Sequence, residues 1–543
     1  MTNARLAAIG LALLSYAAAA LSQSAGLPNL APAALREWLT YLSSDELEGR
    51  ATFSEGLGLA AAYIAEQLKA GGVKPGGDRG LYFQRVAVLG VKSTNRSSVI
   101  VEVNGETRTF RNGEGVTFPP DVGGKQNLTL DKIEFVGYGL NLGPAYNDFK
   151  DADVKNKVIV WLGNRAPRSV DPNLARPVLR SRASLAVDDL GAAATISAPS
   201  FDGQATTNRD GRGGRSTAPD FTTVKRLNVP TPPMITASDE LLEFLFSAAD
   251  IKYAELKAKA DAQEDLPKFA LRNVKLTFNI DADYDIVSTR YTRNVVGIVE
   301  GGDPQLKNTY VAFGAHYDHT GYEQGALEAG ATDRIYNGAD DDGSGTTTLI
   351  GLARTFAQGP KPKRSTVFVW HTGEEIAMWG SEYFADRPIV PIGDIVAQIN
   401  IDMIGRNRDD KESEANSLLA VGSDRISTEL HNILIDANSS LPRPLSLDFE
   451  MNDPADPERI YYRSDHYSYA AKGVPVIFLF SGLHQDYHRV TDTIDKINFE
   501  KMSRVGHLVY ELGRRLANLD HAPVRDFKGP RMGRGATGKI GAK

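Results

Sequence analysis

Histidine and carboxylate side chains gather in five short segments in the C-terminal half of this 543-residue chain. They are GAHYDH with His316 and Asp318, NGADDDGSG with Asp341, HTGEE with Glu374 and Glu375, NID ending at Asp402, and DYH ending at His488. The chain has no cysteine, so any bound metal must be held by imidazole and carboxylate groups. Zinc accepts both ligand types, and two zinc ions about 3.5–4 Å apart need a bridging carboxylate.

Each segment also has an ordinary structural interpretation. The adjacent carboxylates of Glu374 and Glu375 suit the first turn of a helix, where they face the positive end of the helix dipole. An acid run between glycines, such as the one around Asp341, is typical of a turn or a helix cap. The conjunction favours a site, because several of these groups follow strand-like runs and α/β sheets bind ligands at the carboxyl ends of their strands.

Strands and helices alternate in the part of the chain that carries these segments. The apolar runs NVVGIVEG, TYVAFGAHYD, STVFVWHTG, VAQINIDMIG and VPVIFLFSG are separated by helix-like stretches such as GTTTLIGLARTFAQ. This order predicts an α/β fold with a doubly wound, mostly parallel (mixed) sheet.

The remaining chain has a different texture. Helical periodicity in residues 34–68 gives way to strand-like alternation in residues 82–110. We predict α/β segments at 23–112 and 273–522, a β-rich insert at 113–272 and a basic disordered tail at 523–543. Inside the insert, FDGQATTNRDGRGGRSTAPDF is typical of a mobile surface loop rather than an anion-binding patch.

The first 22 residues have the pattern of a secretory signal peptide. Arg5 precedes an apolar run, and Ala20-Leu21-Ser22 suits a cleavage site before Gln23. We expect an exported protein, periplasmic or extracellular, without stable membrane insertion after cleavage; an uncleaved anchor is the alternative. The net charge of -7 gives no reason to expect nucleic acid as a partner.

GAHYDH, NGADDDGSG, HTGEEIAMWGSEYF, INIDMIG and DYHRVTDTIDKI, in this order, resemble the co-catalytic zinc aminopeptidases of metallopeptidase family twenty-eight. The resemblance covers most of the chain. LSSDELEGR is similar to the start of bacterial members, and the region with FVGYGL and VKNKVIVWLG looks like their protease-associated domain.

The resemblance implies two zinc ions and peptide substrates. It places His316 with Asp402 on one zinc, Glu375 with His488 on the other, and Asp341 as the bridge between them. Glu374 would be the general base that moves a proton from the attacking water to the leaving amine. Asp318 would orient the His316 imidazole. Tyr487 would donate to the oxyanion, or be a packed tyrosine, and Asp465 would support the site from beneath or form a pocket wall. His319, His371, His466 and His484 are left out of the metal set.

The sequence departs from the common family pattern at Asn337, at Gly343 and in IAMW after the glutamate pair, which leaves specificity open. A dipeptidase or carboxypeptidase on the same scaffold is a near alternative. A glutaminyl cyclase-like zinc acyltransferase is a second class, although such enzymes lack the insert. A non-catalytic binding protein is disfavoured because every expected metal position carries a suitable residue. Nothing in the sequence predicts the oligomeric state.

Overall fold

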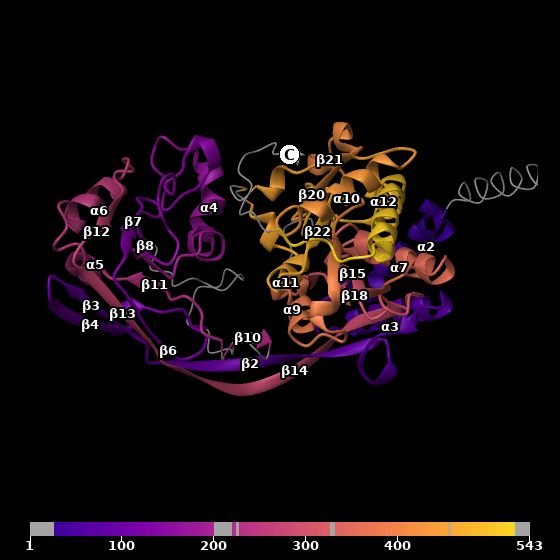
Figure 1. Ribbon diagram of the computed structural model, residues 1–543, viewed down its shortest axis with the longest axis horizontal. Helices are drawn as coiled ribbons and strands as arrows, with labels where there is room; N and C mark the ends of the chain where they lie inside the picture. Colours follow the sequence, from indigo (N-terminus) through magenta and orange to yellow (C-terminus); the bar gives the residue numbers. More distant parts are fainter. Residues whose placement is uncertain are drawn as a thin grey trace, which may run out of the picture.

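The computed structural model describes residues 27–199, 220–223, 227, 229–325, 332–453, 456 and 458–526. The predicted signal peptide, most of the predicted tail and most of the Gly- and Arg-rich stretch lie outside these ranges. Figure 1 shows two lobes joined by a pair of long strands. Within the described ranges, no helix combines the length and apolar character needed to cross a bilayer.

The lobe that carries the predicted site residues, which we call the catalytic lobe after that prediction, is built on a mixed ten-stranded sheet. Its four central strands run parallel to one another, and antiparallel strands flank them on both sides. This arrangement confirms the predicted α/β class. In spatial order the strands are β10 (Asp220–Thr223), β2 (Phe83–Asn95), β14 (Ala282–Val299), β18 (Ser365–His371), β15 (Tyr310–His316), β19 (Ile395–Ile401), β22 (Val476–Phe480), β20 (Ser417–Val421) and β21 (Ser446–Asp448), with β1 (Lys74–Pro75) paired to β14.

Helices cover both faces of this sheet, which explains why the central strands are apolar along their whole length. In the last helix, apolar side chains at three- and four-residue spacing form the buried face. One face of the sheet packs against α2 (Pro32–Leu42), α3 (Glu55–Ala70), α7 (Gly343–Gln358), α10 (Thr428–Ser439) and the last helix, α12 (Phe499–Asn518). The other packs against α9 (Trp379–Asp386) and α11 (His466–Ala470), and the short helix α8 (Glu374–Ala377) precedes α9.

The inserted lobe contains a second ten-stranded sheet with its own apolar core. Its helices are α4 (Pro172–Ser184), which continues into the π-helical turn Leu185–Asp189, then α5 (Asp239–Leu245) and α6 (Tyr253–Asp261). In spatial order its strands are β12 (Phe269–Leu271), β7 (Ile133–Phe135), β8 (Val158–Trp161), β9 (Ala194–Ser197), β11 (Met234–Ala237), β5 (Gly115–Thr117), β4 (Glu106–Asn112), β3 (Ser98–Val103), β13 (Val274–Ile280) and β6 (Gln126–Leu130).

Four strands lie elsewhere than the predicted division at residues 113 and 272 implies. β3, β4 and β13 fall in the ranges assigned outside the insert, yet they pair with one another in the sheet of the inserted lobe. β10 falls in the range assigned to the insert, yet it pairs with β2 in the catalytic lobe. Strand texture shows that a segment is extended but not which sheet it joins, because the partner is distant in sequence.

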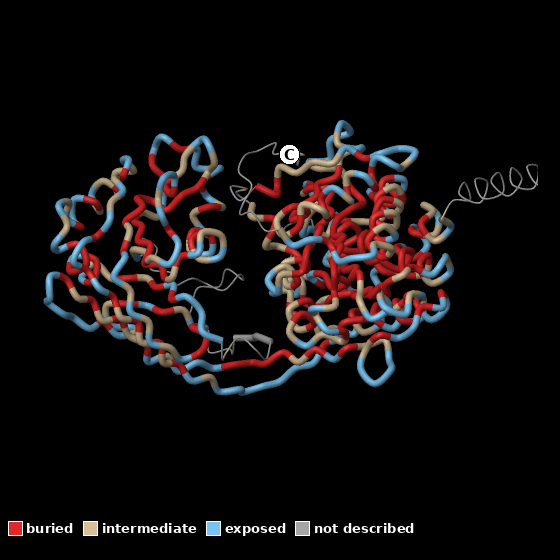
Figure 2. The backbone as a smooth tube through the Cα atoms, in the orientation of Figure 1, coloured by how far each residue is buried: buried red, intermediate tan, exposed pale blue. Residues whose placement is uncertain are grey.

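The two lobes are connected by β2 and β14, which pair antiparallel from Ala282 to Val295. Figure 2 shows that β14 is exposed along this connection while much of β2 is buried, and that burial is dense inside the catalytic lobe. Ile286 and Val287, in the middle of β14, are exposed. A separate two-stranded sheet, β16 (Gly321–Tyr322) with β17 (Ile335–Tyr336), lies in the loop that follows β15.

Candidate metal centre

The predicted site residues follow the carboxyl ends of the parallel strands. His316 is the last residue of β15, and Asp402 comes directly after β19. Glu374 begins α8 just after β18, and Asp341 precedes α7. His488 lies in the loop after β22. Parallel strands present these ends at one edge of the sheet, so residues far apart in sequence meet there.

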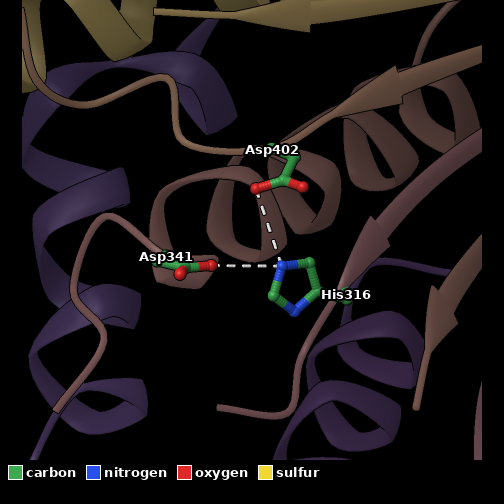
Figure 3. A group of neighbouring side chains, drawn as sticks. All are labelled: His316, Asp341 and Asp402. Atoms are coloured by element: carbon green, nitrogen blue, oxygen red, sulfur yellow. Dashed lines mark ion pairs between the residues drawn. The ribbon is translucent and has the colours of Figure 1, made fainter. Parts of the chain in front are cut away.

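His316 forms the first cluster with two carboxylates. Its Nε2 lies 3.2 Å from Asp341 Oδ1 and 3.6 Å from Asp402 Oδ1, and all three residues are buried (Figure 3). The other ring nitrogen, Nδ1, lies 3.1 Å from the backbone carbonyl oxygen of Asp318. A proton on Nδ1 donated to that carbonyl leaves Nε2 with a free lone pair facing the two acids. The three side chains can therefore share one cation.

A second cluster lies on the other side of Asp341. His488 Nε2 is 2.9 Å from Glu375 Oε2 and 3.1 Å from Asp341 Oδ2. His319 joins the same cluster, with Nδ1 2.7 Å from Glu375 Oε1 and 3.8 Å from Asp341 Oδ2. His319, Asp341 and Glu375 form a second group able to hold a metal ion. The sequence prediction does not include His319 among the metal ligands. Its position three residues after His316 in GAHYDH is the feature that could have indicated a role at the site.

Backbone hydrogen bonds distinguish Asp341 from the acids on either side of it. Asp340 Oδ1 accepts the N–H of Gly405 at 2.6 Å. Asp342 Oδ1 caps α7 by accepting the N–H of Gly345 at 2.9 Å. The Oδ2 atoms of Asp340 and Asp341 are both buried without a hydrogen-bond partner, and each faces an imidazole, that of His484 at 3.3 Å and that of His488 at 3.1 Å. A cation would compensate the cost of burying such an oxygen. The other oxygen of Asp341 lies 3.2 Å from His316, so this carboxylate lies between the two clusters and fits a bridging ligand.

Two buried side chains that sequence reasoning missed hold this loop. Asp492 accepts the backbone N–H of Asp341 at 3.1 Å and that of the preceding residue at 3.0 Å. Arg50, from the N-terminal LEGR segment, donates to the carbonyls of Asn337 at 2.8 Å and Gly338 at 3.0 Å. Asp492 could have been identified from the sequence, because it belongs to the DYHRVTDTIDKI segment. Arg50 carried no signal, because its partners are backbone atoms almost 290 residues away.

Asp318 has a different contact from the predicted one. Its carboxylate Oδ1 lies 3.8 Å from His316 Nδ1, too far for a hydrogen bond, whereas its backbone carbonyl is the near acceptor. The carboxylate instead accepts the backbone N–H of Glu374 at 3.2 Å and the hydroxyl of Thr52 at 3.1 Å. Asp318 thus positions the start of α8 and, with it, the Glu374 side chain, whose Oε2 lies 3.9 Å from His316 Nε2.

The protonation tendencies at the centre follow from burial and from the crowding of charges. Burial raises the pKa of Glu374 well above its ordinary value, and nearby carboxylates add to this effect. Burial likewise raises the pKa of Asp402. Burial also disfavours the charged form of Asp341, but the imidazoles of His316 and His488 outweigh it and lower the pKa of Asp341. A cation here would offset the repulsion among these carboxylates.

A cavity opens onto the first cluster and onto Glu374. Tyr487 lines it and stacks on His488, with ring centroids 3.9 Å apart. Arg463 is the one basic group in the cavity lining besides the imidazole of His316. The rest of the lining is apolar: Met403, Ile460, Phe478, Phe480 and Leu483.

Asp465, for which the sequence leaves two roles open, pairs with a buried histidine. Its Oδ2 is 3.3 Å from His371 Nδ1, and both side chains are fully buried. His371 Nε2 in turn lies 3.0 Å from the hydroxyl of Tyr469. The preceding residue, Ser464, donates its hydroxyl to Asp402 Oδ2 at 2.7 Å. Asp465 is not among the described residues that line the cavity, and its connection to the site runs through the backbone of Ser464.

Comparison with known proteins identifies relatives for the catalytic lobe. Residues 294–513 match the sequence profile of Peptidase family M28. A probable leucine aminopeptidase from Trichophyton verrucosum is 27% identical over 223 residues, which are 39% of this chain and 56% of the relative. Leucine aminopeptidase 1 from Ajellomyces dermatitidis is 27% identical over 229 residues, 40% of this chain and 55% of the relative. The chain thus spans about half the length of these curated relatives.

Solved structures with a similar chain trace include two bacterial enzymes. The aminopeptidase from Aneurinibacillus sp. strain AM-1 has 18% sequence identity and a TM-score of 0.45, covering 93% of this chain and 99% of its own. A zinc aminopeptidase from Bacillus subtilis has 17% identity and a TM-score of 0.42, covering 92% of this chain and 99% of its own.

Proposed function

We propose that this chain, whose residues 294–513 form a peptidase family M28 domain, is an exported metallopeptidase that uses two zinc ions to release N-terminal amino acids from peptides. One observation carries the proposal. The carboxylate of Asp341 lies between two imidazoles, with Oδ1 3.2 Å from His316 and Oδ2 3.1 Å from His488. A carboxylate in that position is the bridging ligand that a pair of nearby cations requires.

The donor set fits zinc. His316 and Asp402 would hold one ion, Glu375 and His488 the other, and Asp341 both. These are nitrogen and oxygen donors without sulfur, as a catalytic zinc centre uses. Zinc bound here would supply a Lewis acid that polarises the scissile carbonyl and makes water more acidic.

Glu374 has the position and environment of a general base. It lines the cavity beside His316, and Asp318 fixes its backbone through the N–H contact at 3.2 Å. Burial raises its pKa, which makes the carboxylate a better proton acceptor at neutral pH. We assign it the transfer of a proton from the attacking water to the leaving amine. Tyr487, in the lining of the same cavity, would donate its hydroxyl to the developing oxyanion.

The cavity wall supports a large apolar N-terminal residue as the preferred substrate. Five of the side chains that line the cavity are apolar, and full burial of a leucine-sized side chain among them is worth roughly 1.5–3 kcal/mol. The fungal relatives, named leucine aminopeptidases, agree with this choice.

Export and the nature of the insert belong to the same proposal. The first 22 residues carry the signal-peptide pattern, and the insert is assigned as a protease-associated domain on the resemblance of its FVGYGL and VKNKVIVWLG segments.

The test combines metal analysis with substrate specificity. The purified mature protein is expected to contain two zinc ions per chain and to release free N-terminal residues from a panel of aminoacyl chromogenic substrates, leucyl fastest. Pyroglutamate formation from N-terminal glutamine would instead favour a cyclase. Cleavage restricted to dipeptides, or release of C-terminal residues, would favour the neighbouring peptidase classes. Protein that binds no zinc at neutral pH would overturn the proposal.

A further inference from the structure

The two lobes touch at a buried ion pair close to the substrate cavity. Arg459, in the loop before the cavity wall, donates from Nη1 to Asp189 Oδ2 at 2.8 Å, across 270 residues of sequence. Asp189 ends the π-helical turn that follows α4 of the inserted lobe. The side chains of Arg459 and Asp189 are only 10% and 4% exposed. In Figure 1, α4 faces the catalytic lobe across the gap that β2 and β14 span from below.

This pair is embedded rather than solvated. Burial raises the pKa of Asp189, and the nearby guanidinium groups of Arg459 and Arg425 oppose that rise. The Arg459 guanidinium also lies over the ring of Tyr462, 4.3 Å from its centroid. Removing one partner would therefore leave the other charged, desolvated and unpaired, which is a far larger perturbation than breaking a surface ion pair.

Residues 459–464, which we call the pocket loop, run directly from this ion pair to the metal centre. Ile460 and Arg463 line the cavity. Ser464 donates to Asp402 Oδ2 at 2.7 Å. The loop begins with Arg459 in the left-handed backbone region, at a φ of 50°. The six-residue loop therefore has the contact with the inserted lobe at its first residue, Arg459, and a hydrogen bond to the proposed zinc ligand Asp402 at its last, Ser464.

The other contacts of the loop lie within its own lobe: Ile460 and Tyr461 are buried in its core, and Asn400 donates to Ser464 Oγ at 3.0 Å. Asp456 accepts the backbone N–H of Ile460 at 3.0 Å, and Arg463 donates to Glu458 at 2.8 Å. Both contacts are local, within five residues in sequence. They stiffen the segment but do not connect it to the inserted lobe, whereas the Arg459–Asp189 pair makes that connection.

We propose that Asp189 is a positioning residue for substrate recognition: from the inserted lobe it holds the pocket loop, and so the Ile460 and Arg463 side of the cavity. This inference rests on the proposed function for the meaning of the cavity. The insert then forms part of the specificity apparatus, although it contributes no side chain to the cavity lining of the described residues. Small displacements of such a wall cost substrate affinity far from the chemistry.

The test replaces Asp189 with Asn, which keeps the shape and removes the charge. We expect KM for a leucyl substrate to rise about tenfold with kcat within about twofold, because the wall moves while the zinc ligands stay. Bound zinc should remain at the wild-type level. Hydrogen exchange should speed up in residues 459–464 and stay unchanged in α12. Asp151→Asn, the same substitution at an exposed acid of the inserted lobe, is the matched control.

A milder variant guards against misfolding. Arg459→Lys keeps Asp189 paired with a cation but loses the planar guanidinium over Tyr462, so KM should rise only about two- to threefold. In the double variant Asp189→Asn/Arg459→Gln, the rise in KM should fall well short of the product of the single effects.

Failure of this inference is distinct from failure of the proposed function. A wild-type protein without aminopeptidase activity would end the proposed function, and hydrogen exchange would still test the coupling. If the wild type is active but Asp189→Asn matches Asp151→Asn in KM and in exchange of the pocket loop, the positioning role is wrong. If kcat and bound zinc fall with KM unchanged, the pair acts on the metal centre and the inference is likewise overturned.

Discussion

Asp492 accepts a hydrogen bond from the backbone N–H of Asp341 at 3.1 Å, although 151 residues separate them. This contact, with a second one to the preceding N–H, sets the direction in which the Asp341 carboxylate leaves the backbone. The residue that could bridge two cations is thus aimed by another carboxylate that never reaches the site itself.

Weakening that support should weaken metal binding. Asp492→Asn keeps one acceptor oxygen but puts an NH2 group against backbone N–H groups, so we expect zinc affinity to fall by about 10- to 100-fold. Competition with a chromogenic chelator measures it. Asp495→Asn, an exposed acid nearby in the chain, is the control. Equal zinc affinity in the two variants would show that Asp492 has no such role.

The adjacent glutamates should separate cleanly by mutation. Glu374→Gln removes the proposed base while leaving the ligands, so turnover should fall by at least about 100-fold with both zinc ions retained. Glu375→Gln removes a carboxylate that lies 2.9 Å from His488 and should release about one zinc ion. Parallel measurements of kcat and zinc content distinguish the two. An active Glu374→Gln enzyme would refute the assignment of the base.

The two histidines beside Glu375 differ in what they do. His488 is predicted as a ligand, so His488→Ala should lower bound zinc from two ions towards one. His319 Nδ1 contacts Glu375 at 2.7 Å, and we expect His319→Gln to keep both ions with about tenfold weaker affinity. Zinc titration of the two variants measures the number of bound ions and their affinity, and so distinguishes a ligand from a supporting residue. If His319→Gln loses an ion and His488→Ala does not, the ligand roles are reversed.

Acid should destabilise the catalytic lobe partly through His466, which stacks on Phe478. Burial lowers the pKa of His466 to about 3, whereas an unfolded histidine titrates near 6.5. The folded state therefore stays neutral while the unfolded chain gains a proton. Its contribution to stability is complete above pH 6.5 and is lost as the pH falls from 6.5 towards 3.

Between pH 7 and pH 5 this difference amounts to about 2 kcal/mol of unfolding free energy. His466→Gln should reduce the loss of stability over that interval by this amount, as measured by denaturant unfolding at both pH values. The same substitution at exposed His521 should leave the loss nearly unchanged. An equal pH dependence in wild type and His466→Gln would contradict the prediction.

The sequence alone determined the chemistry at the strand ends. Buried parallel strands leave long apolar runs in a sequence, and the residues just after those runs, His316 and Asp402 among them, could be identified from adjacency. Absence of cysteine limited the donors to imidazole and carboxylate. These properties depend on residues that are adjacent in the chain, so they can be recognised from the sequence alone.

Tertiary structure decided what depends on partners distant in the chain. Asp340, Asp341 and Asp342 have the same side chain, so in the sequence only the resemblance selects Asp341. In the fold, Gly405 and Gly345 donate to its neighbours, and Asp341 lies between the imidazoles of His316 and His488. His319 entered the second cluster and the carboxylate of Asp318 turned to the backbone of α8 for the same reason. The residues of β3 and β10 do not specify which sheet each strand joins; pairing with β13 and with β2 determines it. Hydrogen-bond acceptors and packing partners are assigned by the folded chain, because burial forces each polar group to find one wherever it lies.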